Sequence, residues 1–134
     1  MNCDGPDAYL FLYGTLMRGE SAHARFALST RASFIGEACV PGRLIELGGY
    51  PGLVEGDGMV EGEIHRLLDP TLLVELDHYE ECDPDAGADA GYVRERMTVP
   101  GSGLRAWVYR YRGPLACGRM LPQSRWRGAL AGAR

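Results

Sequence analysis

Glycine and proline residues divide this sequence into short runs that are rich in β-branched, aliphatic and aromatic side chains. Residues 9–13 form a continuous apolar run closed by Gly14, which predicts a buried strand that ends in a tight turn. Further strands are predicted at residues 33–40, 43–47, 92–99 and 104–111. Typical turn residues, Pro41-Gly42 and Pro100-Gly101, separate them in pairs. This pattern favours a mostly antiparallel sheet that can close into a small barrel.

The middle of the chain predicts a tight hairpin. Residues 53–55 and 59–61 flank Gly56-Asp57-Gly58, and glycine readily adopts the positive φ angles that hairpin turns need. Strand alternation then places Val60, Gly62 and Ile64 on one face of the second arm.

Two helices are predicted between and before these strands. Asp69 and Pro70 predict a helix over residues 69–80, because Asp69 can accept free amide hydrogens and proline fits the first helical position. A shorter helix is predicted around residues 21–28. Residues 82–91 hold acids and helix breakers without periodicity, so we expect a surface loop there.

The position of Glu80 on the longer helix indicates a special role. Three leucines at positions 72, 73 and 76 form an apolar stripe, and Glu80 falls within about 35° of its centre at 100° per residue. Glu75 falls about 105° from that centre, so we expect it to be a solvated surface acid. A carboxyl group that faces the core has a raised pKa, which suits a general acid or base near neutral pH. The alternative is that Glu80 simply pairs with Arg94 or Arg96.

The loop after the first strand is the natural complement to such a group. Backbone amides of Gly14, Thr15 and Leu16 can bind a carboxylate or a developing oxyanion. An ordinary turn that leaves a buried strand is the other interpretation.

Composition and charge limit the classes of partner. The 134 residues are 46% hydrophobic and 24% charged, which predicts one globular domain over residues 1–134. A net charge of −4 speaks against nucleic-acid binding, which needs a basic excess. The first residues lack the basic and apolar segments of a secretion signal, and no run is long enough for a membrane span, so we expect a cytoplasmic protein. Small molecules are the expected partners.

Cysteine and histidine spacing gives no metal or redox motif. The four cysteines lie far apart without a Cys-x-x-Cys pair, and the three histidines are equally dispersed. We therefore expect free thiols and no bound metal.

Five segments make the chain resemble the gamma-glutamylcyclotransferase superfamily, including the gamma-glutamylamine cyclotransferases and AIG2-like proteins. The segments are residues 9–19 (YLFLYGTLMRG), 50–52 (YPG), 60–64 (VEGEI), 76–80 (LDHYE) and 92–94 (YVR). The resemblance covers most of the chain. It implies an α+β fold, with a small mixed, mostly antiparallel β-barrel and flanking helices.

The resemblance also implies a reaction. In that superfamily a gamma-glutamyl amine or amide cyclises to 5-oxoproline and releases the amine, without a cofactor. The glutamate that closes the fourth segment is the acid/base, and it corresponds to Glu80. The loop that cradles the substrate corresponds to Tyr13, Gly14, Thr15 and Leu16.

Weaker candidates surround these residues. Tyr109 or Tyr111 on the last long strand is expected to reach the polar end of the substrate. Arg18 and Arg94 are candidates for its α-carboxylate, although a structural role is the more common fate of such arginines.

Two other classes of function stay open from the sequence. One is a non-catalytic small-ligand-binding protein of the same fold. The other is a thiol enzyme that uses Cys82 beside His78, although these residues lie in no known motif of that class.

Overall fold

The computed structural model describes residues 8–14, 16–47, 51–79, 91–113, 115 and 118–126. Within these residues the elements follow in the order β1 (Tyr9–Leu12), α1 (Ser21–Arg25), α2 (Leu28–Arg31), β2 (Ala32–Glu46), β3 (Pro51–Leu67), α3 (Thr71–Tyr79), β4 (Tyr92–Val99), β5 (Leu104–Tyr111) and β6 (Arg119–Met120). The predicted strands at residues 9–13, 92–99 and 104–111 are thereby confirmed. In the described part of the chain, no helix is both long and apolar enough to cross a membrane.

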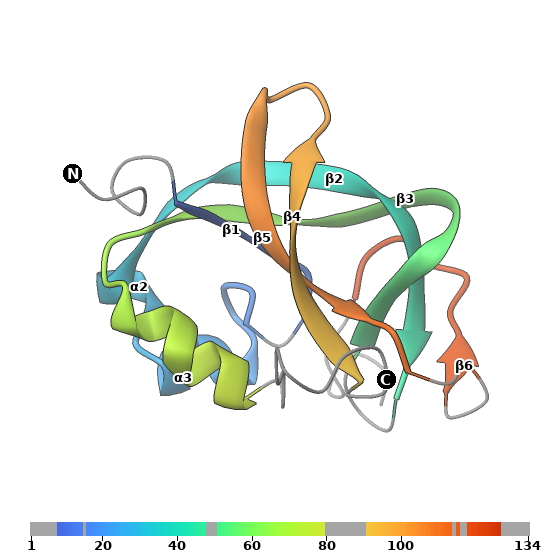
Figure 1. Cartoon of the computed structure of the whole chain (residues 1–134), viewed down its shortest axis with the longest axis horizontal. Coiled ribbons are helices and arrows are strands. Elements are labelled where there is room, and N and C mark those ends of the chain that lie inside the picture. Colours follow the sequence, from blue (N-terminus) through green and yellow to red (C-terminus); the bar gives the residue numbers. More distant parts are fainter. Residues whose placement is uncertain are drawn as a thin grey trace.

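The strands form one mixed, mostly antiparallel sheet that curls into a half-barrel (Figure 1). Their order is β4-β5-β1-β3-β2-β6, and β5 runs parallel to β1. Near its end β5 also pairs with β3, at Leu53 opposite Arg110. Because β5 passes from β1 onto β3, these three strands pair with one another and the sheet curves around its core.

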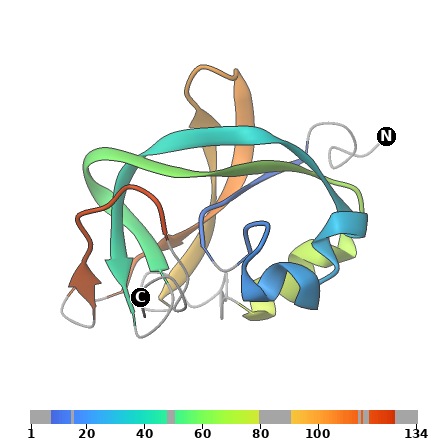
Figure 2. The ribbon, with the colours of Figure 1, turned by 180° about the vertical axis from the view of Figure 1, so that it is seen from behind.

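The long β2–β3 hairpin dominates the molecule and replaces two of the predicted turns (Figure 2). Residues 33–40 and 43–47 belong to one strand, and so do residues 53–55 and 59–61, so the predicted hairpin at Gly56-Asp57-Gly58 is wrong. The register jumps from Pro41 opposite Met59 to Arg43 opposite Val54. The glycines therefore form an irregular bulge, and such bulges bend a strand without ending it.

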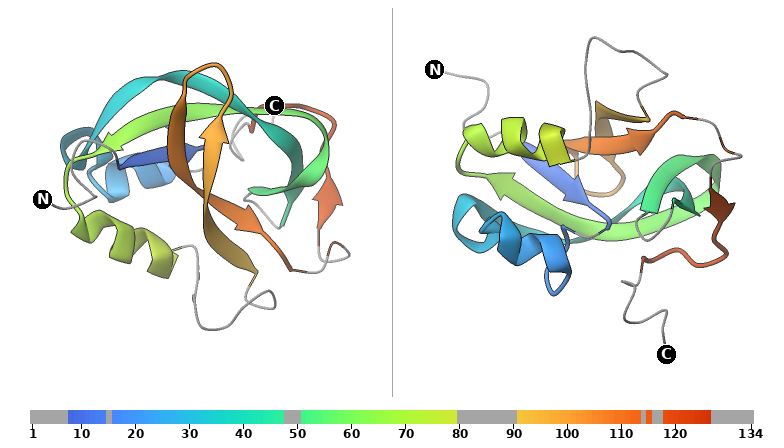
Figure 3. Two further views of the ribbon diagram at one scale, coloured as in Figure 1. Left: turned by 45° about the horizontal axis from the view of Figure 1, so that its top comes forward. Right: turned by 90° about the horizontal axis from the view of Figure 1, so that it is seen from below.

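The helices gather at one end of the sheet. Figure 1 shows α2 and α3 next to each other below β1 and β3, and in Figure 3 (right), seen from below, the strands run between them. The predicted helix at residues 69–80 is confirmed over Thr71–Tyr79, where the Asp69 carboxylate accepts a hydrogen bond from the Thr71 amide at 3.0 Å. Leu72 and Leu76 are buried and Glu75 is 49% exposed, as the apolar stripe predicts.

The helix predicted at residues 21–28 is broken in the structure. Helix α1 ends at Arg25, and Ala27 adopts a left-handed backbone with φ of 54° before α2 begins at Leu28. Such a residue cannot continue a right-handed helix. Its carbonyl oxygen accepts hydrogen bonds from the Thr30 hydroxyl and the Arg31 amide instead.

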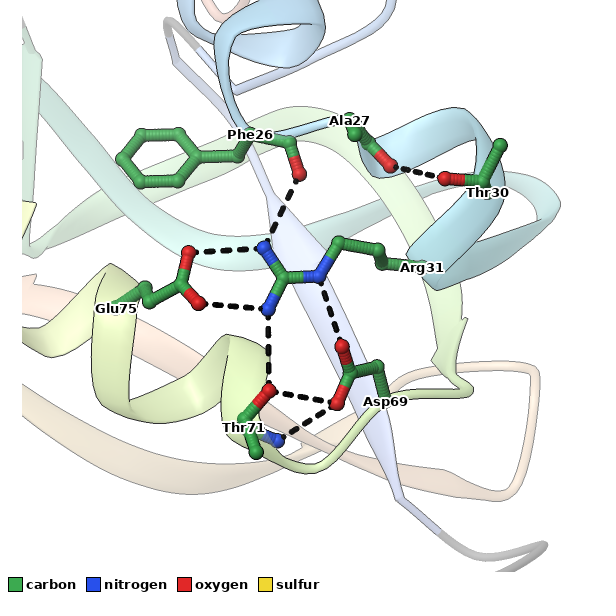
Figure 4. A network of polar contacts seen from close by, with 7 residues as sticks. All are labelled: Phe26, Ala27, Thr30, Arg31, Asp69, Thr71 and Glu75. Atoms are coloured by element: carbon green, nitrogen blue, oxygen red, sulfur yellow. Dashed lines mark hydrogen bonds and ion pairs between the residues drawn. The ribbon is translucent and has the colours of Figure 1, made fainter.

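Arg31, the last residue of α2, joins α2 to α3 (Figure 4). Its guanidinium donates to Asp69 at 2.9 Å and, through two nitrogens, to Glu75 at 2.8 and 2.9 Å. Hydrogen bonds from Thr71 and then from Arg31 lower the pKa of Asp69, and those from Arg31 lower the pKa of Glu75. Both carboxylates are therefore more easily ionised in the folded chain than in the unfolded chain.

Gly62 allows β1 and β3 to approach closely. A methyl group in place of its hydrogen would lie 2.5 Å from the Leu12 carbonyl oxygen and 2.7 Å from the Phe11 ring. Neither neighbour can move freely, because Phe11 and Leu12 are buried in the core.

We expect Gly62→Ala to lower the free energy of unfolding by about 1–3 kcal/mol, the usual cost of overpacking a core. Urea unfolding at neutral pH measures the change. Gly36→Ala on the neighbouring strand is the control, because a methyl group there meets nothing within 4 Å. Equal stability of Gly62→Ala and the wild type would contradict this explanation.

Removing the Arg31 charge should lower stability in a pH-dependent way. Because the pKa values of Asp69 and Glu75 are lowered in the folded chain, their stabilising effect is complete at neutral pH. It is lost as the pH falls below their ordinary pKa values of 3.8 and 4.5, respectively. Arg31→Met should therefore lower the urea midpoint at pH 7, and the gap from wild type should narrow in acid. A gap that stays constant from neutral pH to the acid limit would oppose this assignment, and Arg105→Met on exposed β5 surface is the control.

Candidate active site

The structure describes five of the seven residues predicted for the site. Glu80 and Thr15 lie outside the described residues, so their predicted roles stay predictions. The remaining five are Tyr13, Gly14, Leu16, Tyr109 and Tyr111. They gather where the end of β1 meets β3 and β5.

Tyr13 ties these three strands together. Its side chain is only 6% exposed. The hydroxyl accepts a hydrogen bond from the Leu53 amide of β3 at 3.0 Å and donates one to the Tyr109 carbonyl oxygen of β5. Strand β1 has ended at this point, so its backbone no longer pairs with β3 and β5. The Tyr13 side chain instead forms hydrogen bonds with backbone groups of both strands. The Tyr13 hydroxyl is part of the frame of the site.

The loop after Tyr13 packs directly on the start of β3. A methyl group added at Gly14 would lie 2.7 Å from the ring of Pro51. The Met17 amide donates to the Gly14 carbonyl oxygen at 3.0 Å, which closes a four-residue turn. The loop is thereby held against the start of β3 at Gly14 and closed at Met17.

Asp77 connects α3 to the sheet on the side of the candidate site. Its carboxylate accepts hydrogen bonds from Arg94 at 2.9 and 3.1 Å and from the Tyr109 hydroxyl at 2.6 Å. Trp107 packs against the Arg94 guanidinium at 4.4 Å. These contacts hold the C-terminal part of α3 three residues before Glu80. They also give Arg94 a structural role, which was the alternative to binding the substrate.

Tyr111 lies on the same strand but in a different environment. Its ring meets that of Tyr92 edge to face at a centroid distance of 5.9 Å. A methyl group at Gly52 would lie 2.7 Å from Tyr111 Cβ, so this glycine lets β3 and β5 come together. The Tyr92 hydroxyl donates to the Pro51 carbonyl oxygen. Tyr92 thus has a packing role.

Sequence reasoning missed a buried polar cluster on β3. Glu63 and His65 are 2% and 1% exposed. Glu63 Oε1 accepts a hydrogen bond from the Arg18 amide at 3.0 Å and lies 3.0 Å from His65 Nε2. The other oxygen, Oε2, accepts from Arg18 Nε at 3.3 Å. Alternation along the strand could have placed Glu63 and His65 on one face, but it could not show that this face is covered.

The electrostatics of the cluster fix its protonation. Burial alone raises the pKa of Glu63, but hydrogen bonds from Arg18 and His65 outweigh it and hold that pKa below its usual value. Burial lowers the pKa of His65, and Glu63 only partly opposes this effect. At neutral pH Glu63 is therefore an anion, and neutral His65 donates its Nε2 hydrogen to it.

A cavity of about 280 Å³ lies beside this cluster. Arg18, His23, Phe34 and His65 contribute to its wall. His23 Nδ1 lies 2.9 Å from the Leu16 carbonyl oxygen, which can only accept, so Nδ1 carries the hydrogen. The cluster and the loop are thus linked at both Leu16 and Arg18.

The structure describes only some of the residues that bear on a thiol enzyme. Cys39, the cysteine that the structure describes, is a free thiol. Cys82 lies outside the described residues. Among the described residues, no group of three His, Cys, Asp or Glu side chains is placed to hold a metal ion.

Comparisons with known proteins agree with this architecture. The family described as "Gamma-glutamyl cyclotransferase, AIG2-like" matches residues 10–128. The Escherichia coli K12 "Gamma-glutamylcyclotransferase family protein YtfP" is 31% identical over 119 residues, which cover 87% of this chain and 94% of that protein. The solution structure of E. coli YtfP superimposes with a TM-score of 0.65 at 30% identity, covering 88% of this chain and 95% of that one.

Two further relatives extend the comparison. The crystal structure of a Mus musculus AIG2-like protein shares the fold, with a TM-score of 0.67, 24% identity and 92% of each chain covered. The "Gamma-L-glutamyl-butirosin B gamma-glutamyl cyclotransferase" of Niallia circulans is 38% identical over 73 residues. That match covers 52% of this chain and 46% of the relative.

The half-barrel, with its loop between β1 and α1, has the fold of AIG2-like proteins. Because the family match spans residues 10–128, the chain belongs to the AIG2-like gamma-glutamylcyclotransferase family. Membership of this family indicates a gamma-glutamylcyclotransferase-like activity.

The hydrogen bond between Tyr109 and Asp77 should stabilise the packing of α3 on the sheet. We expect Tyr109→Phe to lower the free energy of unfolding by about 1.5–3 kcal/mol, the usual value for a bond to a charged group. Urea unfolding measures the loss, and amide hydrogen exchange should show faster exchange in α3. Tyr9→Phe is the control, because the Tyr9 hydroxyl bonds nothing in the described part of the chain; equal stability of the two variants would refute the assignment.

Proposed function

We propose that this chain cyclises a gamma-glutamyl amine or amide to 5-oxoproline and releases the amine. The observation that carries the proposal is the family match over residues 10–128, which includes both the Tyr13 loop and Glu80. The butirosin relative supports a gamma-glutamyl substrate, because its name gives gamma-L-glutamyl-butirosin B as the molecule on which it acts.

The proposed reaction needs no external nucleophile. The α-amine of the glutamyl group attacks its own side-chain carbonyl, so one C–N bond forms in the ring and the bond to the leaving amine breaks. Holding the two groups in place can supply roughly 7 kcal/mol or more of the barrier. The protein has therefore to fold the substrate and to move a proton.

Glu80 is the proposed acid/base. It takes one proton from the substrate α-ammonium and passes it to solvent, then takes a second from the attacking nitrogen as the ring bond forms and gives it to the leaving nitrogen, which ends the turnover with Glu80 as a carboxylate again. The Asp77 contacts with Arg94 and Tyr109 support this role, because they fix the helix that leads to Glu80. The proposed cytoplasmic location is consistent with a small-molecule substrate.

The loop of Tyr13, Gly14, Thr15 and Leu16 is the proposed oxyanion site. The turn closed between Gly14 and Met17 supports this role, because it holds the loop against Pro51 at the start of β3. Backbone donors in such a loop stabilise charge that develops on the carbonyl oxygen of the tetrahedral intermediate. Tyr109 and Tyr111 are the proposed substrate-binding residues on the side of β5.

Glu80→Gln should abolish turnover and preserve binding. We expect a fall in kcat of about 100-fold or more, because general acid–base catalysis contributes that much. Mass spectrometry of 5-oxoproline formed from a panel of gamma-glutamyl amines and dipeptides measures the change. Glu75→Gln, on the exposed side of the same helix, is the control and should keep the wild-type kcat.

Each outcome of that experiment has a meaning. Product from the wild type but not from Glu80→Gln supports the proposal and names the class of leaving amine. Equal product from both proteins removes Glu80 from the mechanism. Ligand binding without any product indicates the non-catalytic binding protein, and loss of activity with iodoacetamide would favour the thiol enzyme.

A further inference from the structure

Glu63 lies at the base of the Tyr13 loop. In the β1–β3 ladder Glu63 is directly opposite Leu12, the last residue of β1. The chain leaves the sheet after Leu12, makes the turn between Gly14 and Met17, and returns to Glu63 at Arg18. Both ends of the loop are therefore attached to one residue of β3.

The bond from Glu63 to the loop is a strong one. A buried carboxylate that accepts from a backbone amide forms a charge-assisted hydrogen bond, which is about twice as strong as a neutral one. The contact with the Arg18 side chain is weaker, since it measures 3.3 Å and that side chain is 46% exposed. The hydrogen bond from the Arg18 backbone amide to Glu63 therefore makes the main connection, and the ion pair with the Arg18 side chain adds less.

His65 keeps Glu63 oriented and charged. The neutral imidazole donates to the same oxygen that accepts from the Arg18 amide. His65 itself packs edge to face against Phe34, with a centroid distance of 5.5 Å. The Arg18 guanidinium covers that Phe34 ring at 3.4 Å. His65 therefore holds the Glu63 carboxylate in place, and Phe34 with the Arg18 guanidinium shields this cluster from water.

We propose that Glu63 is a positioning residue that holds the Tyr13 loop in the shape needed to bind the developing oxyanion. The inference rests on the proposed function and extends it to the segment at residues 60–64, for which the reaction itself gives no role. A purely structural ion pair is the competing explanation. It would lower stability in a variant without a specific effect on the chemical step.

The test compares Glu63→Ala and Glu63→Gln with the wild type in the 5-oxoproline assay. We expect Glu63→Ala to lower kcat by about 10–100-fold with little change in KM, because a loop displaced by about 1 Å loses its alignment with the transition state. Glu63→Gln keeps an oxygen that can accept from the Arg18 amide, so it should recover most of the lost kcat. Glu61→Gln is the matched control, because it lies on the same face of β3 and bonds Ser124 instead.

Amide hydrogen exchange at Arg18, followed by NMR, provides a readout that does not need activity. Exchange should be faster in Glu63→Ala than in the wild type and in Glu61→Gln. Wild-type exchange at Arg18 in Glu63→Ala would overturn the proposal, and so would a wild-type kcat. If Glu63→Ala does not fold, amide exchange at Arg18 in Glu63→Gln decides instead, with a smaller increase expected and wild-type exchange overturning the proposal.

The design separates this inference from the proposed function. If the wild type forms no 5-oxoproline, the proposed function fails while Arg18 exchange still decides whether Glu63 holds the loop. If the wild type is active and Glu63→Ala matches it, the reaction stands and the positioning role is rejected. A rise in KM at constant kcat would also reject it, because the loop would then serve binding alone.

Discussion

The Tyr13 hydroxyl makes the contact on which the rest of the site depends. Strand β1 ends at Leu12, and beyond it the backbones of β3 and β5 pair at only one described position, Leu53 with Arg110. By bonding the Leu53 amide and the Tyr109 carbonyl oxygen, Tyr13 satisfies polar groups that would be costly to bury alone. The half-barrel can therefore curl at this point, and the loop that follows starts from a fixed position.

From that starting point the loop is supported by two sets of contacts. Asp77 draws α3 onto Tyr109 and Arg94. Glu63 bonds Arg18, and His23 bonds Leu16. Arg31 in turn joins α2 directly to α3. A rigid loop is what preorganised donors require, since they lower a barrier only if they need not rearrange during the reaction.

Local signals predicted the elements whose ends are defined by nearby residues. The Asp69-Pro70 helix start and the turn between β4 and β5 are of this kind, and both were confirmed. The glycines at 56 and 58 suit a hairpin as well as a bulge, and the choice depends on Pro41 and Gly42 across the ladder. Gly42 has a φ of 143° and leaves no room for a methyl group beside Leu53, which a single local window cannot reveal.

The candidate site, like the fold, could be predicted from the sequence only where neighbouring residues determine it. Helical periodicity correctly separated exposed Glu75 from the leucine stripe, whereas strand alternation gave Glu63 no role because the cover over its face comes from residues 18–34. The motif glycines are explained by contacts inside the chain: Gly14 with Pro51, Gly52 with Tyr111, and Gly62 with Leu12. These segments therefore specify a frame and a loop. In the proposed function this frame holds the glutamyl part of the substrate, so the choice of leaving amine falls to residues outside the frame.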